Sequence, residues 1–249
     1  KAEARAKSGG RATERHGRGI AEHEAKTAAR EAKTAATGKK PGGKPPEPPV
    51  EGPGPSDQIN LTDEDSRIMP AAGGGFEQSY NAQAAVATGS LLVVAIEVVQ
   101  APNDKNQVEP MLEKIEALPE ELGKVEHLLA DAGYFSAGNV DACARAGVEP
   151  VIAMGRQPHH PPLSVRFAPT PAAPEQSTPV QAMAHKLKTP EGRALYALRK
   201  QTPEPVFGII KSVLGFRQFS LRGLEKVRGE WTLVTMAWNL KRMFAFSPA

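Results

Sequence analysis

The segment from Tyr80 to Ala153 most constrains the fold, because its apolar spacing alternates between the period of strands and the period of helices. The elements that we predict from it are two strands within residues 80–100, a helix over 105–118, a strand at 125–130, a helix over 136–146 and a strand at 149–153. A turn at Thr88-Gly89-Ser90 would join the first two strands as a hairpin. This order is typical of the interior of a mixed α/β sheet flanked by helices.

The residues before and after this segment differ in composition, which predicts the domain organisation. Residues 1–37 have a helix-forming composition interrupted by glycines, so we predict a helix only over about 20–36. Residues 38–55 are dominated by Gly, Pro and Lys, as in an extended linker. The predicted parts are a basic flank at 1–59 that is helical or largely disordered, a folded domain at 60–249, and a proline-rich insertion in that domain at 155–180.

The later part of the chain predicts helices. Thr189-Pro190-Glu191 and Thr202-Pro203-Glu204 each supply an N-cap, a proline and a first-turn acid. We therefore predict helices from these two points, and a last helix over 224–246 with an apolar stripe. The acidic residues 61–69 predict a turn or a short helix.

Charge is distributed unevenly along the chain. The 249 residues carry a net charge of +3, but residues 1–44 alone hold twelve Lys or Arg against five Glu. A polyanion would therefore bind to this flank first, although a charged tail that only keeps the chain in solution has the same composition.

Cys143 lies in an alanine-rich stretch and fits a buried side chain in a reducing compartment. No apolar run is long enough for a membrane helix, and a signal peptide is not evident, so we predict a cytoplasmic protein.

Two acidic residues stand where an α/β fold can bring carboxylates together. Asp131 follows the strand predicted at 125–130, and Glu204 lies in the first turn of a predicted late helix. A carboxylate at the carboxyl end of a buried strand, facing one from a helix, can hold a divalent metal for phosphoryl transfer. Asp131 could also stabilise its own turn, and Glu204 could belong to an exposed face with surface ion pairs.

Several separate short motifs of this sequence are similar, in order, to the catalytic half of bacterial insertion-sequence transposases. The motifs are Asn60 to Met69, Tyr80 to Val86, Ala130 to Tyr134, Glu204 to Gly208 and Gly215 to Phe219, followed by Asn239-Leu240. The chain thus resembles the transposases that carry an Asp-Asp-Glu metal triad on a ribonuclease H-like fold. The resemblance covers about 60–246.

This resemblance implies a role for five residues. Asp131 and Glu204 would be the second and third members of the triad and would hold Mg²⁺ or Mn²⁺. Tyr196, Arg199 and Lys211 match the pattern around the last carboxylate and would contact DNA. Lys211 follows Glu204 by two helical turns, so both would project from one face. The resemblance also implies that the partner is the DNA of transposon terminal inverted repeats, that the active parent protein is a homodimer, and that it works on the nucleoid.

The sequence departs from the family in two places. In the family, the first triad aspartate stands in an Asp-Gly-Thr motif on an early strand, and this motif does not occur here. We therefore expect the first strand of the sheet to be missing and the chain to be truncated on its N-terminal side. Ala87 also stands where relatives commonly have an aspartate. Asp63, Asp65 and Asp104 could substitute for the first aspartate, but the first two lie outside the strand pattern and Asp104 is better explained as a helix cap.

Three functions follow as hypotheses. The first is a portion of a transposase that catalyses metal-dependent DNA strand cleavage and strand transfer, inactive alone because one carboxylate is absent. The second is a non-catalytic DNA-binding remnant that uses the basic residues 1–44. The third is an unrelated metal-dependent nuclease on the same kind of sheet.

Overall fold

The computed structural model describes residues 2–38, 42–49, 60–71, 73–155, 162–163, 172 and 177–246. The chain divides into two compact units, an N-terminal unit at Lys1–Asp65 and a C-terminal unit at Ser66–Ala249. Most of the insertion predicted at 155–180 and half of the linker predicted at 38–55 lie outside the described residues.

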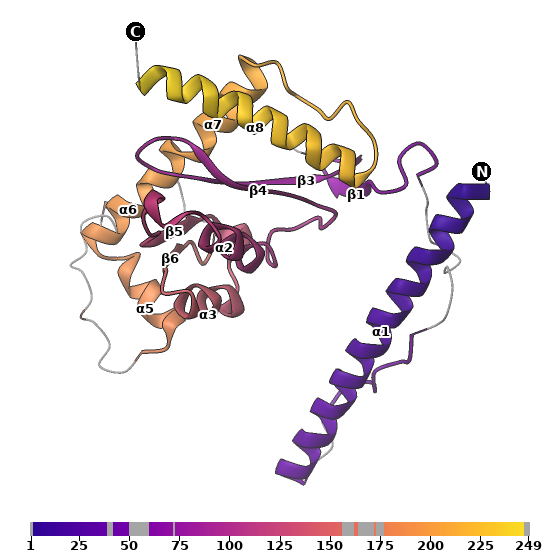
Figure 1. Cartoon of the computed structure of the whole chain (residues 1–249). Coiled ribbons are helices and arrows are strands. Elements are labelled where there is room, and N and C mark those ends of the chain that lie inside the picture. The colour runs from indigo at the N-terminus through magenta and orange to yellow at the C-terminus, as the bar shows by residue number, and fades with distance from the viewer. Residues whose placement is uncertain are drawn as a thin grey trace. The chain divides into compact units, whose positions relative to one another are not determined.

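The N-terminal unit is built on one long helix, α1, which spans Ala2–Thr37 (Figure 1). The prediction of a helix only over 20–36 is therefore wrong at its start. A glycine inside a helix costs about 1 kcal/mol relative to alanine. The Ala, Lys, Glu and Arg residues between the glycines favour the helix strongly enough to carry it through them.

The described part of the linker, residues 42–49, runs back beside α1. Arg30 donates from its guanidinium to the carbonyl oxygen of Gly43 at 3.2 Å, and His23 Nε2 lies 3.2 Å from the carbonyl oxygen of Pro46. The segment has no helix or strand of its own. Side chains of α1 thus bind some of the backbone carbonyl oxygens of this segment.

The strands of the C-terminal unit lie in three two-stranded sheets. The antiparallel pairs are β1 Arg67–Pro70 with β2 Phe76–Ser79 and β3 Asn81–Val86 with β4 Val93–Val99, and the parallel pair is β5 His127–Ala130 with β6 Glu149–Ile152. The fold is thus mixed α/β, as predicted. The described strands do not join into the one sheet that we expected.

Helices accompany these sheets (Figure 1). They are α2 Val108–Glu116, α3 Ala137–Arg145, α5 Pro179–Lys186, α6 Pro190–Gln201, α7 Pro203–Ser212 and α8 Leu224–Phe246, with the short 3₁₀ helices η1 Glu120–Leu122 and η2 Ala132–Tyr134. The two Thr-Pro-Glu signals begin α6 and α7, as predicted. Thr189 caps α6 by accepting from Gly192 N, whereas Thr202 makes no such side-chain bond at α7.

The first hairpin, β1 and β2, was not predicted. The turn expected in residues 61–69 is present only before the strand, at residues 64–65, and Ile68 and Met69 lie in β1. Gly74 and Gly75 have φ of +88° and +83°, which glycine adopts without strain, so the glycine run is the turn between two strands.

The second hairpin, β3 and β4, was predicted and carries the main core. The fully or almost fully buried residues of this core are Val93, Val98, Val206, Ile210, Val227, Trp231 and Trp238. They come from β4, α7 and α8, and Phe207 of α7 stacks on Trp231 with ring centroids 5.7 Å apart. This packing places α7, and with it Glu204, against the hairpin.

The outer edge of β4 is covered by side chains of the neighbouring helices. At one end Asn239 of α8 accepts from Val93 N and donates to Val93 O, both at 2.8 Å. Trp238 Nε1 donates to the carbonyl oxygen of Leu91 at 2.8 Å. The amide of Asn239 thereby replaces the backbone of a neighbouring strand.

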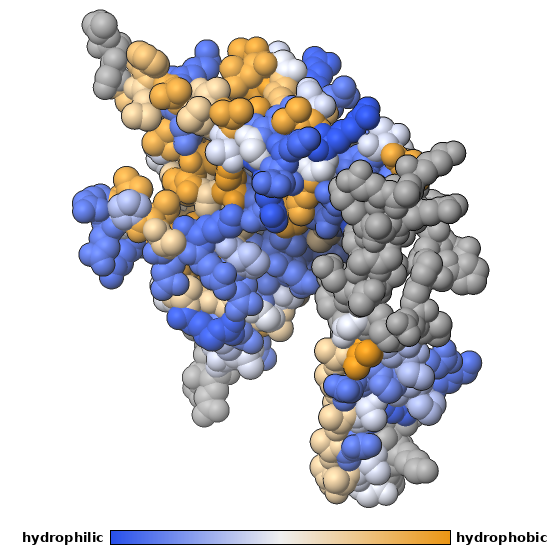
Figure 2. Space-filling view, turned by 45° about the vertical axis from the view of Figure 1, so that its right-hand side comes forward, coloured by the Kyte–Doolittle hydropathy of each residue, from blue (hydrophilic) through white to orange (hydrophobic). Residues whose placement is uncertain are grey.

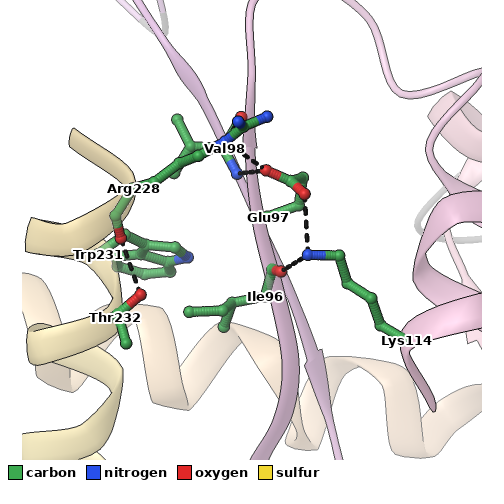
Figure 3. A pocket seen from close by; sticks show the side chains of 7 residues that line it. All are labelled: Ile96, Glu97, Val98, Lys114, Arg228, Trp231 and Thr232. Atoms are coloured by element: carbon green, nitrogen blue, oxygen red, sulfur yellow. Dashed lines mark hydrogen bonds and ion pairs between the residues drawn. The ribbon is translucent and has the colours of Figure 1, made fainter. Parts of the chain in front are cut away.

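Two cations from different helices cover the rest of this edge, around a pocket of about 320 Å³ (Figure 3). Lys114 of α2 donates to the carbonyl oxygen of Ile96 at 3.0 Å, and Arg228 of α8 donates to that of Val98 at 3.3 Å. Each cation also lies 2.8 Å from a carboxylate oxygen of Glu97. Burial raises the pKa of Glu97, but the hydrogen bonds from Lys114 and Val98 N and the charge of Arg228 outweigh burial and leave that pKa below its usual value. The charged trio therefore fastens α2 and α8 to β4.

Two strand edges are not covered in this way. Alternation along the ladders assigns the outward backbone groups of β3 to Ala82 and Ala84, and those of β5 to His127 and Leu129. Within the described part of the chain, these groups have no hydrogen-bond partner. β3 and β5 thus each have an open edge.

Candidate functional site

Asp131 begins the turn that follows β5. Its backbone is extended, and Oδ1 accepts a hydrogen bond from Gly133 N at 2.8 Å. It therefore stabilises the start of η2, which is the structural role that the sequence left open. Among the described residues Oδ2 has no partner, and the side chain is only half-buried, so one oxygen is free to bind a ligand.

A second aspartate, Asp104, lies beside this turn. A Cβ atom on Gly133 would lie 3.0 Å from Asp131 Oδ1 and 3.5 Å from Asp104 Oδ2, so both carboxylates border the same glycine. The prediction that Asp104 caps the following helix is wrong, because α2 begins later, with Gln107 as its N-cap and no side-chain cap.

Two amide side chains of β3 hold Asp104 in place. Asn81 Nδ2 and Gln83 Nε2 each donate to Asp104 Oδ1 at 2.7 Å. Residues two apart in a strand point to the same face, so β3 presents both amides to the aspartate. Sequence reasoning missed this contact, and the signal was present: two amides at alternate positions of an otherwise apolar strand.

Tyr134 links the same strand to the turn of Asp131. Its hydroxyl donates to Gln83 Oε1 at 2.5 Å. Burial raises the pKa of Tyr134 well above its usual value, and the negative charges of Asp104 and Asp131 raise it further. The phenol thus stays protonated and remains a donor. Two motifs that are far apart in the sequence, at 80–86 and 130–134, contact each other in this network.

Glu204 lies in the first turn of α7 and is 58% exposed at its side chain. Arg199 Nη2 lies 3.4 Å from Glu204 Oε1, and the guanidinium stands over the ring of Tyr196 at 5.6 Å from the centroid. The Arg199 side chain is only 18% exposed, and its Nε is buried without a hydrogen-bond partner. The structure thus brings Tyr196, Arg199 and Glu204 together.

Lys211 lies in the last turn of α7, on the same exposed face as Glu204. The opposite face of α7, with Val206 and Ile210, is buried in the core. This agrees with the two-turn spacing in the sequence. Within the described part of the chain Lys211 makes no ion pair, so its ammonium is available to an anion.

The described contacts form two clusters. One joins Asp131 and Asp104 through Gly133, and the other joins Glu204 to Arg199. Among the described residues, no three His, Cys, Asp or Glu side chains gather closely enough to hold a metal ion. Two carboxylates with substrate phosphates and water are a ligand set that Mg²⁺ accepts, so the aspartate pair fits such an ion in part. Asp63, another possible substitute, instead accepts from Asp65 N in a local turn.

The chain matches a known protein family. The family model described as the transposase DDE domain matches residues 49–240. No curated protein matches the chain, and no solved structure does. In the described part of the chain, no helix combines the length and the apolar character needed to cross a membrane.

Proposed function

Because the chain belongs to the transposase DDE domain family, whose members cleave and transfer DNA in transposition, we propose that it is the metal-binding portion of such an enzyme. Asp131 and Glu204 are the proposed ligands of Mg²⁺ or Mn²⁺, and the proposed substrate is the DNA of transposon terminal inverted repeats. The observation that carries this proposal is the place of Asp131, directly after β5, with one oxygen bound to its turn and the other unbound.

Each side chain has a part in the proposed reaction. A metal at the carboxylates would polarise the scissile phosphate and stabilise the leaving oxygen. Asp131 is oriented for this by the bond from Gly133 N, and Asp104 beside it adds negative charge that favours a cation. Lys211 and Arg199 would hold the DNA backbone, Arg199 being positioned by stacking on Tyr196.

The proposal includes a ribonuclease H-like sheet that lacks its first strand. The network at Gln83 and Tyr134 joins the beginning of β3 to the end of β5, so these strands run in opposite directions on either side of it. One further strand could pair with both open edges, parallel to β5 and antiparallel to β3. Such a strand would carry the first triad aspartate, and without it we expect the chain to be inactive.

A strand-cleavage assay tests the proposal. The chain is incubated with Mg²⁺ or Mn²⁺ and with DNA that ends in the matching terminal repeats, and we expect no cleavage above background. Adding the missing strand upstream, with its Asp-Gly-Thr motif, should restore cleavage. In that longer protein, Asp131→Asn or Glu204→Gln should abolish cleavage again. Robust cleavage by the chain alone would refute the inactivity, and restored cleavage that survives Asp131→Asn would refute the assigned site.

A second candidate is a DNA-binding remnant without chemistry, which the basic α1 favours. Lys and Arg outnumber Glu by seven in residues 1–44, and α1 is one continuous helix. Binding by this flank should fall steeply with salt concentration and should not respond to Asp131→Asn or Glu204→Gln. Binding that requires Mg²⁺ and loses that requirement in these variants favours the metal site instead.

The proposal has two consequences for where and how the protein works. The active parent would be a homodimer, because two transposon ends are cleaved and joined together. It would act in the cytoplasm, on the nucleoid.

A further inference from the structure

Helix α8 has apolar side chains on two opposite faces. Val227, Trp231 and Trp238 on one face are buried in the core. The other face is exposed. Its members are Leu233, Met236, Leu240, Met243 and Phe244, which are 62%, 51%, 50%, 57% and 77% exposed. We call these five residues the α8 apolar face. A helix that is apolar on all sides is normally buried on all sides, so within the described part of the chain this face lacks a partner.

The spacing and charge of the α8 apolar face indicate what kind of partner it fits. Leu233, Met236, Leu240 and Met243 follow one another at intervals of three, four and three residues, the spacing of the seam between two packed helices. No charged residue stands from 231 to 240. Figure 2 shows apolar side chains gathered along the upper part of the molecule, where α8 lies. A surface for DNA would need cations here, so the pattern fits an apolar protein helix.

We propose that the α8 apolar face pairs with the same face of a second copy of the chain, with the two helices antiparallel about a two-fold axis. Such a contact uses one patch twice, and this patch is self-complementary. Antiparallel pairing places Leu233 against Met243 of the other copy and Met236 against its Leu240. Side chains of one helix then pack between those of the other, and no charged side chain is buried.

The area of the face is sufficient for a weak but specific dimer. Each of its five side chains exposes about 100 Å² or more, so pairing removes on the order of 1,000 Å² from water over both copies, the size at which specific interfaces begin. The inference rests on the homodimer of the proposed function, but its test needs neither DNA nor metal. Failure of one can therefore be told from failure of the other.

Sedimentation equilibrium of the whole chain tests the pairing. We expect a reversible dimer at micromolar concentration, and we expect Met236→Glu with Leu240→Glu to raise its dissociation constant by about 100-fold or more, as loss of central contacts does. The matched control is Leu122→Glu, which also places a charge at an exposed leucine, 70% exposed in η1. This control should leave the dissociation constant unchanged.

Disulfide trapping keeps the proposal testable if the charged double variant does not fold. Met236→Cys chains mixed with Leu240→Cys chains should give cross-linked dimers faster than either variant alone, because antiparallel pairing joins these two positions. Cys143 is fully buried and does not compete. A chain that stays monomeric at about 100 µM, equal loss of the dimer in Leu122→Glu, or no preference for the mixed disulfide would each overturn the proposal.

Discussion

Gln83 joins Asp104 to Tyr134 although it carries no charge. It is 3% exposed, accepts from the Tyr134 hydroxyl and donates to Asp104 and to Asn81 Oδ1. Its polar atoms are therefore satisfied by partners on two other segments. A buried amide that is fully bonded fixes its neighbours, because any displacement leaves a polar atom without a partner.

Replacing Gln83 by leucine should destabilise the chain by about 2–4 kcal/mol, because the Tyr134 hydroxyl and Asp104 each lose a buried partner. The free energy of unfolding in urea measures this. Gln201→Leu, at the exposed end of α6, is the control and should change stability by less than about 0.5 kcal/mol. Equal stabilities of the two variants would show that the network does not hold the site together.

Because of Tyr134, the free energy of unfolding should depend on pH in the alkaline range. Its pKa is raised in the folded chain by burial and by Asp104 and Asp131. Stability from the protonated phenol is therefore complete below the unfolded pKa of about 10 and declines as the pH rises above it. Between pH 9 and pH 11 the wild type should lose about 1 kcal/mol more unfolding free energy than Tyr134→Phe. Parallel losses in both proteins would contradict the buried, protonated phenol.

The site could be predicted only as far as local patterns reach. The position of Asp131 at the end of a strand was predicted correctly, because an apolar strand followed by Asp-Ala-Gly is visible within a few residues. Asp104 was misassigned, because Asn-Asp before a helix has the same local pattern whether it caps the helix or bonds to a distant strand. Its contact with Asn81 crosses 23 residues and depends on how the hairpin packs.

Among the elements, α5 and α6 approach each other more closely than side chains allow. Gly192 in the first turn of α6 is buried, and a Cβ there would lie well inside contact distance of the Lys186 carbonyl at the end of α5. The obstacle is backbone, which cannot move as a flexible side chain does. Glycine at this position therefore sets the angle between the helices.

Gly192→Ala should destabilise the chain by about 3 kcal/mol or more, since overpacking against backbone forces the two helices apart. Gly208→Ala in α7 is the matched control, because a Cβ there meets nothing within 4 Å. This control should stabilise by up to about 1 kcal/mol through helix propensity. Thermal unfolding followed by circular dichroism compares the two, and a Gly192→Ala protein as stable as the control would exclude the close approach.

The elements that the sequence predicted have their signals within a few residues. The β3–β4 hairpin and the starts of α6 and α7 are of this kind. The hairpin of β1 and β2 was missed, because the acidic residues before Arg67 dominate the pattern and β1 has only four residues. The joining of strands into a sheet could not be predicted either, since it depends on pairing between segments that are far apart.

At the scale of the whole molecule, the outer edge of β4 is covered, whereas the edges of β3 and β5 are open. Asn239, Lys114 and Arg228 satisfy the outer edge of β4. No described group does so for β3 or β5. An open edge is a place where another strand can add, and a covered one is not. Covering of the outer edge of β4 therefore leaves the edge of β3 as the place where a strand can add to that hairpin.

Hydrogen exchange of backbone amides can distinguish these edges. In the chain at low concentration, the amides of Ala84 and Leu129 face outward and should exchange much faster than those of Ala85 and Ala130, which face the partner strands. If a strand placed upstream adds between β3 and β5, Ala84 and Leu129 should both become protected, because each edge gains a partner. Protection of only one of them would mean that the strand adds to a single sheet. Strong protection of both in the chain alone, unchanged on dilution, would show that the two edges are already paired.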